Sequence, residues 1–239
     1  MTATRERAIN LRDWEVRAIQ AGRLKMLVRP VKWVGTEPGL NLGFSGLSAG
    51  FYCTDLPSSG FVLYSRGRGG CWEQRTRPTH CPYGKAGDRL RGREAAAIND
   101  TGRPAARYHF NAHVKYKADG LNINFDVDLK HWRTAFENNA LRYQSSIHMP
   151  RWAVRNWLEI TEVRCGRARD MSQHDAESAG ADCDFVEVRD GGPEWSHDAV
   201  WADDYVSPFA AQYDADHGEG AWERDWVWMI GIKRIEGGK

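Results

Sequence analysis

Three arginines alternate with Leu90 and Gly92 in the stretch 89–93. In a β-strand every second side chain points to the same side, so Arg89, Arg91 and Arg93 should form one row of guanidinium groups. Guanidinium groups make paired hydrogen bonds with phosphate, and a row of them is costly to bury without partners. The row therefore predicts either a contact with the phosphates of a nucleic acid or a solvated rim of the sheet.

A glycine-rich turn, GKAGDRL (84–90), precedes this row and carries Lys85. Two glycines around a lysine resemble a phosphate-binding loop, but the spacing and the following Ser or Thr of that loop are absent. We interpret the segment as a tight turn that sets the next strand, and we keep Lys85 as a candidate ligand contact.

The stretch 148–157 interleaves cations with aromatic rings: His148, Arg151, Trp152, Arg155 and Trp157. This mixture suits base stacking combined with phosphate capture. Tryptophan in a small sheet domain is also a core residue, and we assign Trp152 to the core. We retain His148 and Arg151 as candidate ligand contacts.

The composition is that of a globular protein, with 239 residues, 41% hydrophobic and 27% charged. The net charge of +1 hides a split, because residues 1–170 hold 28 basic and 16 acidic side chains, and residues 171–239 hold 5 and 16. Such an asymmetry is typical of a polyanion-binding face beside an acidic segment, although the two halves could also neutralise each other.

The sequence predicts a reduced, cytoplasmic protein without a metal or other cofactor. No signal peptide or membrane-length apolar run is present, and the five cysteines include no C-x-x-C pair. No Ser-His-Asp signature is visible, and no set of candidate metal ligands has a recognised spacing. These sets are Cys71, His80 and Cys81; His109, His113 and His131; and Asp203, Asp204, Asp214 and Asp216.

The pattern of elements predicts an α+β protein. Helices are expected over 11–22, over 171–181 with Ser172 as N-cap, and over 203–214. Strands are expected over 24–34, 89–97, 107–120, 145–168 and 225–235, with a hairpin at 61–75, while 121–144 is ambiguous.

Several stretches resemble the ASCH domain, a family of the PUA-like β-barrel superfamily, in versions like those of bacteriophage and prophage genes. The strings CPYGKAGDRL (81–90) and SIHMPRWA (146–153) are the most specific. The similar stretches as a whole are 16–23, 81–94, 116–120, 146–164, 171–180 and 220–235. It implies a PUA-like β-barrel with peripheral helices and a nucleic-acid or modified-nucleoside cleft.

One branch of that family removes an acyl group from acetylated cytidine with a Lys, a Thr and a Glu. The resemblance places Leu24 and Leu27 at the Lys and Thr positions, and leucine can supply neither base nor nucleophile. Glu94 matches the Glu, and Lys25 and Arg29 lie beside the altered positions. Glu94 and Lys25 are thus the candidate catalytic residues, and the departure weighs against the acyl-removing reaction.

We therefore predict a single domain over 1–239, with a loop-rich insertion at about 35–77 and an acidic segment at about 182–225. The leading function is a module that binds RNA, or a modified nucleotide, in a basic cleft; DNA is an alternative ligand. The cleft residues are Lys25, Arg29, Lys85, Arg91, Arg93, Glu94, His148 and Arg151. The alternatives are a hydrolase (an amidohydrolase or a ribonuclease) and a phage accessory protein that binds another protein.

Overall fold

The computed structural model describes residues 4–52, 59–106, 109–128, 143–181, 184–188 and 200–236. The chain forms two compact units, each assembled from separate segments. Unit 1 contains residues 1–22, 83–161 and 232–239, and unit 2 contains residues 23–82 and 162–231. Within the described residues, no helix has the length and apolar character needed to cross a membrane.

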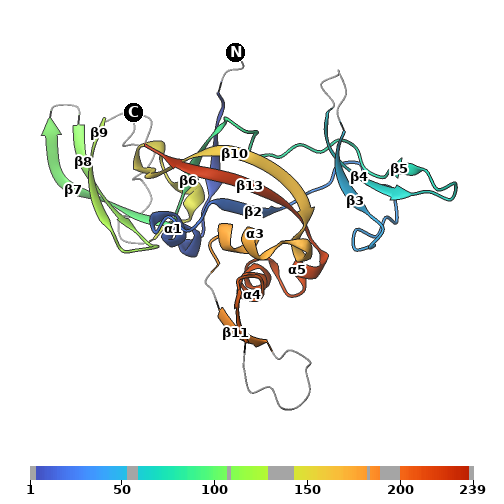
Figure 1. Cartoon of the computed structure of the whole chain (residues 1–239). Coiled ribbons are helices and arrows are strands. Elements are labelled where there is room, and N and C mark those ends of the chain that lie inside the picture. Colours follow the sequence, from blue (N-terminus) through green and yellow to red (C-terminus); the bar gives the residue numbers. More distant parts are fainter. Residues whose placement is uncertain are drawn as a thin grey trace. The chain divides into compact units, whose positions relative to one another are not determined.

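The largest sheet has five strands in the order β1-β6-β10-β13-β2 (Figure 1). Its strands are β1 (Glu6–Asn10), β6 (Arg89–Arg93), β10 (Asn156–Arg167), β13 (Trp226–Ile235) and β2 (Met26–Pro30). The β1–β6 pair is parallel, whereas the β6–β10 and β13–β2 pairs are antiparallel. This mixed sheet, with its helices, confirms the predicted α+β class.

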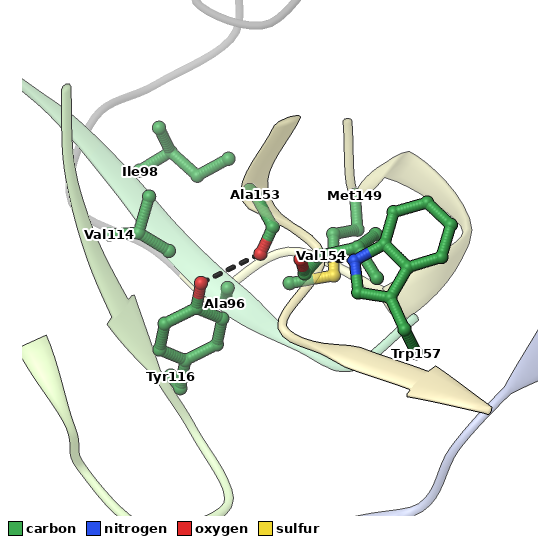
Figure 2. Packing of buried hydrophobic residues seen from close by; sticks show 8 residues of the cluster. All are labelled: Ala96, Ile98, Val114, Tyr116, Met149, Ala153, Val154 and Trp157. Carbon is green, nitrogen blue, oxygen red and sulfur yellow. Dashed lines mark hydrogen bonds between the residues drawn. The ribbon is translucent and has the colours of Figure 1, made fainter. Parts of the chain in front are cut away.

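Unit 1 adds helix α1 (Asp13–Gln20) and an antiparallel sheet of β7 (Ala96–Ala106), β8 (His109–Tyr116) and β9 (Asn122–Asp128). Two short 3-10 helices, η1 (Ser146–His148) and η2 (Arg151–Ala153), precede β10. Figure 2 shows the core of this unit, in which the Tyr116 hydroxyl donates a hydrogen bond of 2.7 Å to the Ala153 carbonyl oxygen. The packed residues are Ala96, Ile98, Val114, Tyr116, Met149, Ala153, Val154 and Trp157.

Unit 2 contains the antiparallel sheet β3-β4-β5, formed by β3 (Ser48–Tyr52), β4 (Gly60–Arg66) and β5 (Trp72–Gln74). It also contains the pair β11 (Asp184–Val188) and β12 (Val200–Asp204). Its helices are η3 (Ala168–Asp170), α3 (Gln173–Ser178), α4 (Val206–His217) and α5 (Ala221–Arg224). Leu47, Leu63 and Trp226 form a cluster of buried residues in this unit.

Local signals in the sequence located most of these elements. Ser172 caps α3, and its hydroxyl accepts a hydrogen bond from the Asp175 backbone in the predicted capping box. The hairpin at 61–75 is confirmed as β4–β5, and the ambiguous stretch 121–144 begins with β9. The loop-rich insertion at 35–77 thus holds a three-stranded sheet.

Four expectations need correction. The single strand expected over 89–97 is two strands of different sheets, β6 and β7. The helix expected over 203–214 begins only at Val206, because the residues before Tyr205 form β12. The strand expected over 145–168 begins only at Asn156, because Pro150 leads into η2 and the preceding residues form 3-10 turns. The closed β-barrel is not observed: in the part of the chain that the structure describes, none of the four sheets closes on itself. The prediction of one domain over the whole chain stays a prediction.

Candidate functional site

The predicted turn before the arginine row is confirmed and is held by Asp88. The buried Asp88 carboxylate accepts hydrogen bonds from the backbone nitrogens of Lys85 (3.1 Å) and Arg5 (3.0 Å). Gly84 adopts a φ of 122°, which is strained for a residue with a side chain. These contacts fix the start of β6, and the Lys85 side chain is exposed in the turn.

The three arginines of β6 lie on one face of the strand, as predicted. Arg89 is exposed and Arg91 and Arg93 are half-buried, whereas Leu90 and Gly92 between them are buried. Arg151 joins the row through Glu6, because its Nε and Nη2 atoms donate hydrogen bonds of 3.1 and 2.9 Å to the two Glu6 carboxylate oxygens. We call Arg89, Arg91, Arg93 and Arg151 the arginine surface.

Strand pairing explains which neighbours this surface has. Glu6 and Glu159 are the register partners of Arg89 on β1 and β10, and Trp157 is the β10 partner of Arg91. Register partners share a face of the sheet. Glu159 is engaged by Lys233 Nζ at 3.3 Å. Among the described residues, the surface and Lys233 bring five positive charges to this face, and Glu6 and Glu159 bring two negative ones.

Glu6 is the carboxylate at the centre of the arginine surface. The hydrogen bond from Arg151 lowers the pKa of Glu6, and the charges of Arg151, Arg91 and Arg89 act in the same direction. Arg91 Nε lies 3.4 Å from a Glu6 oxygen. Among the described residues, the buried Nε atoms of Arg91 and Arg93 have no hydrogen-bond partner. The positive charge of the row is therefore only partly compensated.

The end of the row reaches the 3-10 turns before β10. Arg93 Nη1 donates a hydrogen bond of 3.1 Å to the Ile147 carbonyl oxygen, and the next residue, His148, is exposed. The Arg151 guanidinium lies 5.3 Å from the centre of the Trp157 ring, a cation–π distance. Four of the predicted ligand contacts, Arg91, Arg93, His148 and Arg151, thus lie in unit 1 near one another.

Glu94 follows the row and belongs to a different environment. Its carboxylate is fully buried, and its Oε1 accepts hydrogen bonds from Arg155 Nε and Asn156 Nδ2, both at 2.8 Å. Its Oε2 accepts a third hydrogen bond from Arg155 Nη2 at 2.7 Å. Gln20 of α1 in turn donates to Asn156 Oδ1 at 2.7 Å. We call this set, with Asp119, the Glu94 network.

Arg155 is shared between two carboxylates. Its Nη1 donates to Asp119 Oδ2 at 2.7 Å, its side chain is 9% exposed, and its guanidinium lies 4.0 Å from the centre of the Tyr116 ring. Burial raises the pKa of Glu94, and the Arg155 hydrogen bonds oppose that rise without cancelling it. Burial also tends to raise the pKa of Asp119. The hydrogen bonds from Arg155 and from the Leu121 backbone outweigh it, so the pKa of Asp119 is lowered.

These contacts limit what Glu94 can do chemically. A general base must have an oxygen free to accept a proton from its substrate. Both Glu94 oxygens are engaged inside the protein, so a substrate would have to displace Arg155 or Asn156 to reach them. The arrangement is that of a fully satisfied buried ion pair.

The candidates on and beside β2 belong to unit 2. Lys25 is exposed just before the strand, and its backbone nitrogen donates to the Ser178 carbonyl oxygen at 2.7 Å. Arg29 is buried, and its Nη1 donates to the Val28 carbonyl oxygen at 2.8 Å. Leu24 and Leu27 are also buried.

The remaining candidates are the possible metal ligands, the Cys165 thiol and the Trp152 ring. In the described residues, no group of three or more His, Cys, Asp or Glu side chains is placed to hold a metal ion, and His131 and the stretch 189–199 lie outside those residues. Burial raises the pKa of the Cys165 thiol to about 12, so it is protonated at neutral pH. Trp152 is half-buried and packs edge-on against Phe125 at 5.6 Å, which agrees with its assignment to the core.

Sequence reasoning did not single out Glu6, Asp119 or Asn156, and it did not pair Arg155 with Glu94. The alternation of side chains along β10 points Asn156 and Trp157 to different faces of the sheet. No local signal relates Asn156 to Glu94, which lies 62 residues earlier in the chain. Glu6 precedes the row by more than eighty residues and reaches it only through the parallel β1–β6 pair.

Comparisons of the chain with models of protein families, with curated protein sequences and with solved structures found no match. They therefore carry over no activity, ligand or partner from another protein.

Proposed function

We propose that this protein binds nucleic acid, RNA in the first place, through phosphate contacts at the arginine surface. The observation that carries the proposal is the row of Arg89, Arg91 and Arg93 on one face of β6, joined by Arg151. A phosphate backbone is a regular series of negative charges, and arginine binds phosphate oxygens through its planar set of donors.

Charge balance at this surface supports phosphate as the ligand. In the part of the chain that the structure describes, Glu6 and Glu159 neutralise two of the five positive charges of this face, which leaves an excess of three. The stems of Arg91 and Arg93 are half-buried, so their guanidinium groups lose less conformational freedom on binding than those of mobile surface arginines. His148, exposed beside Arg93, can add a hydrogen bond to phosphate or base.

The same contacts make hydrolysis the weaker alternative. Glu94 is fully buried and saturated by Arg155 and Asn156. Leu24 and Leu27 are buried apolar residues, and neither can act as a base or a nucleophile. An amidohydrolase or a ribonuclease would need other groups, so binding is the function that this geometry favours.

We also infer that the chain is a divergent relative of the ASCH domain. The order of elements supports this inference, because α1, β6, β10, α3 and β13 occur along the chain where the similar stretches lie. A closed PUA-like barrel is not part of the inference, since the described strands form an open sheet. A solved structure of the chain with bound RNA would test both the fold relationship and the location of the ligand.

The main test is a titration of fluorescently labelled RNA with the wild type and with Arg91→Glu/Arg93→Glu, at two salt concentrations. The double reversal should weaken binding at least tenfold, about 1.4 kcal/mol. It should also reduce the slope of log K against log salt by about two, because two phosphate contacts are lost. Arg91 and Arg93 are not fully buried, so the variant should remain folded by circular dichroism.

The matched control is Lys32→Glu/Arg224→Glu, which changes the net charge equally at two exposed positions. An equal loss in the control would show that total charge decides binding, and it would contradict the proposal. No binding by the wild type to single- or double-stranded RNA or DNA at low salt would also contradict it. Release of acetate from acetylated cytidine, abolished in Glu94→Gln, would favour the hydrolase.

A further inference from the structure

The small sheet β3-β4-β5 of unit 2 exposes aromatic side chains that the arginine surface does not use. Trp72 is 56% exposed and Tyr52 is 38% exposed, although both are on strands. Large aromatic rings left in water on a sheet are unusual in a protein without a partner, because burying each one would stabilise the fold. The sheet is drawn in Figure 1.

Strand register places these rings on one face. The pairs Gly50–Val62, Tyr52–Gly60 and Arg66–Trp72 are direct register partners, and Tyr64 pairs with Gln74. Partners in register and residues two apart along a strand share a face. Tyr52, Tyr64, Arg66 and Trp72 therefore lie on the same face, which we call the aromatic face.

Glycine at position 50 makes room on this face. A Cβ atom at Gly50 would lie 3.1 Å from Cε2 of Tyr64, so the Tyr64 ring rests against the bare backbone of β3. Val62 lies on the same face and is fully buried, so this face is exposed at Trp72, at the Arg66 end of β4, and at Tyr52, at the Gly60 end. On the opposite face Leu63 packs with Leu47 and Trp226. Phe51 is also on that face, where it packs edge-on against Phe61 and is 59% exposed, but no cation is placed against its ring there among the described residues.

Positive charge accompanies the rings. The Arg66 guanidinium lies 5.6 Å from the centre of the Trp72 ring, and Arg68 is exposed in the glycine-rich turn between β4 and β5. Glu73 is on the opposite face of β5, since its register partner is Ser65, and it pairs with Arg75 at 2.7 Å. The aromatic face therefore combines exposed rings with cations. The Glu73 carboxylate lies against Gly67, between Arg66 and Arg68, and its charge is matched by Arg75.

We propose that the aromatic face binds single-stranded nucleic acid by stacking bases on Trp72 and Tyr52, with phosphates on Arg66 and Arg68. Stacking on aromatic rings together with arginine is the usual means of holding unpaired bases, and it needs no particular sequence. A duplex hides the faces of its bases, so this surface selects single strands. The inference takes its ligand class from the proposed function and adds a second binding surface to it.

The test uses the full chain and two probes: a twelve-nucleotide oligouridine and a twelve-base-pair RNA duplex. Trp72→Ala should weaken binding of the single strand about tenfold, as for the loss of one stacked base, and should leave duplex binding unchanged within twofold. Trp72→Phe keeps a stacking ring and should retain most of the affinity. Tyr143→Ala removes an aromatic ring of 45% exposure from unit 1 and is the matched control.

A photocrosslink gives a readout independent of affinity. Oligouridine with 5-bromouridine, irradiated with the wild type, should attach to the peptide that contains Trp72, as located by mass spectrometry. Crosslinks confined to other peptides would overturn the inference.

The outcomes separate the two proposals. Equal single-strand affinity for Trp72→Ala and the wild type overturns the stacking surface and leaves the arginine surface standing. Loss of affinity in Trp72→Ala, with none in Arg91→Glu/Arg93→Glu, supports the stacking surface and overturns the arginine surface. If the wild type binds neither probe, both proposed surfaces are overturned. If the aromatic face binds a protein and not RNA, nucleic acid is excluded as its ligand.

Discussion

The two faces of β6 use the same kind of charge in opposite ways. On one face Arg89, Arg91 and Arg93 are exposed or half-buried around Glu6, and positive charge is in excess. On the other face Gly92 is buried, and the adjoining Glu94 carboxylate is matched by Arg155. A change of one position along the chain thus moves a charged residue from a surface open to ligands into a buried ion pair.

This difference shows how burial decides the role of a charge. A buried carboxylate must be fully hydrogen-bonded, because an unpaired one costs several kcal/mol, so Glu94 is committed to the fold. An arginine at the surface keeps its charge solvated and can exchange water for a phosphate at little cost. We therefore expect substitutions on the buried side to change stability and substitutions on the exposed side to change binding.

The largest effect should come from Arg155→Ala. The substitution leaves Glu94 without its two Arg155 hydrogen bonds and Asp119 without its ion pair. Removing one partner of a buried pair costs about 3–5 kcal/mol of the free energy of unfolding. Urea denaturation followed by circular dichroism measures this loss.

Arg89→Ala on the exposed side is the control for this experiment and should change stability by less than about 0.5 kcal/mol. The double variant Glu94→Leu/Arg155→Met should recover much of the stability lost in Arg155→Ala, because apolar pairs can replace a buried ion pair. Equal stability of Arg155→Ala and the wild type would show that the two sides of β6 do not differ in this way.

A smaller effect is expected from Gly92→Ala, which tests how closely the buried side is packed. The added Cβ would lie 2.5 Å from Leu11 Cδ1 and 3.0 Å from both Cβ and the carbonyl oxygen of Asn156. Overpacking of this kind costs about 1–3 kcal/mol, measured by thermal unfolding. Gly69→Ala, which would meet nothing within 4 Å, is the control and should leave the melting temperature nearly unchanged.

The smallest effect should follow from Glu6→Gln, which removes the carboxylate at the centre of the arginine surface. Arg91 and Arg151 lose their ion pairs with Glu6 and become available to phosphate. RNA binding at low salt should tighten about two- to fivefold, and the gain should disappear in high salt because it is electrostatic. Glu223→Gln, at an exposed position of unit 2, should leave the affinity unchanged. Weaker binding by Glu6→Gln would mean that Glu6 positions Arg151 for its ligand.

Much of the fold could be predicted because its signals are local. The segment 11–22 has the apolar positions that α1 buries, Val16, Ala18 and Ile19. The alternation of β6 is visible in five residues, and its exposed row is confirmed. The predicted start of β10 was wrong, because the 3-10 turns after Ser145 carry no periodic signal that distinguishes them from a strand.

The sequence by itself determined the row of arginines, the turn that starts it and the cap of α3, because each of these depends on residues within a few positions of one another. Only the tertiary structure decided which charges meet. Strand pairing brings Glu6 beside Arg89 and places Asn156 opposite Gly92, next to Glu94. Such pairs join residues that are 60 or more positions apart, and their choice depends on the register of the sheet, which no short stretch of sequence specifies.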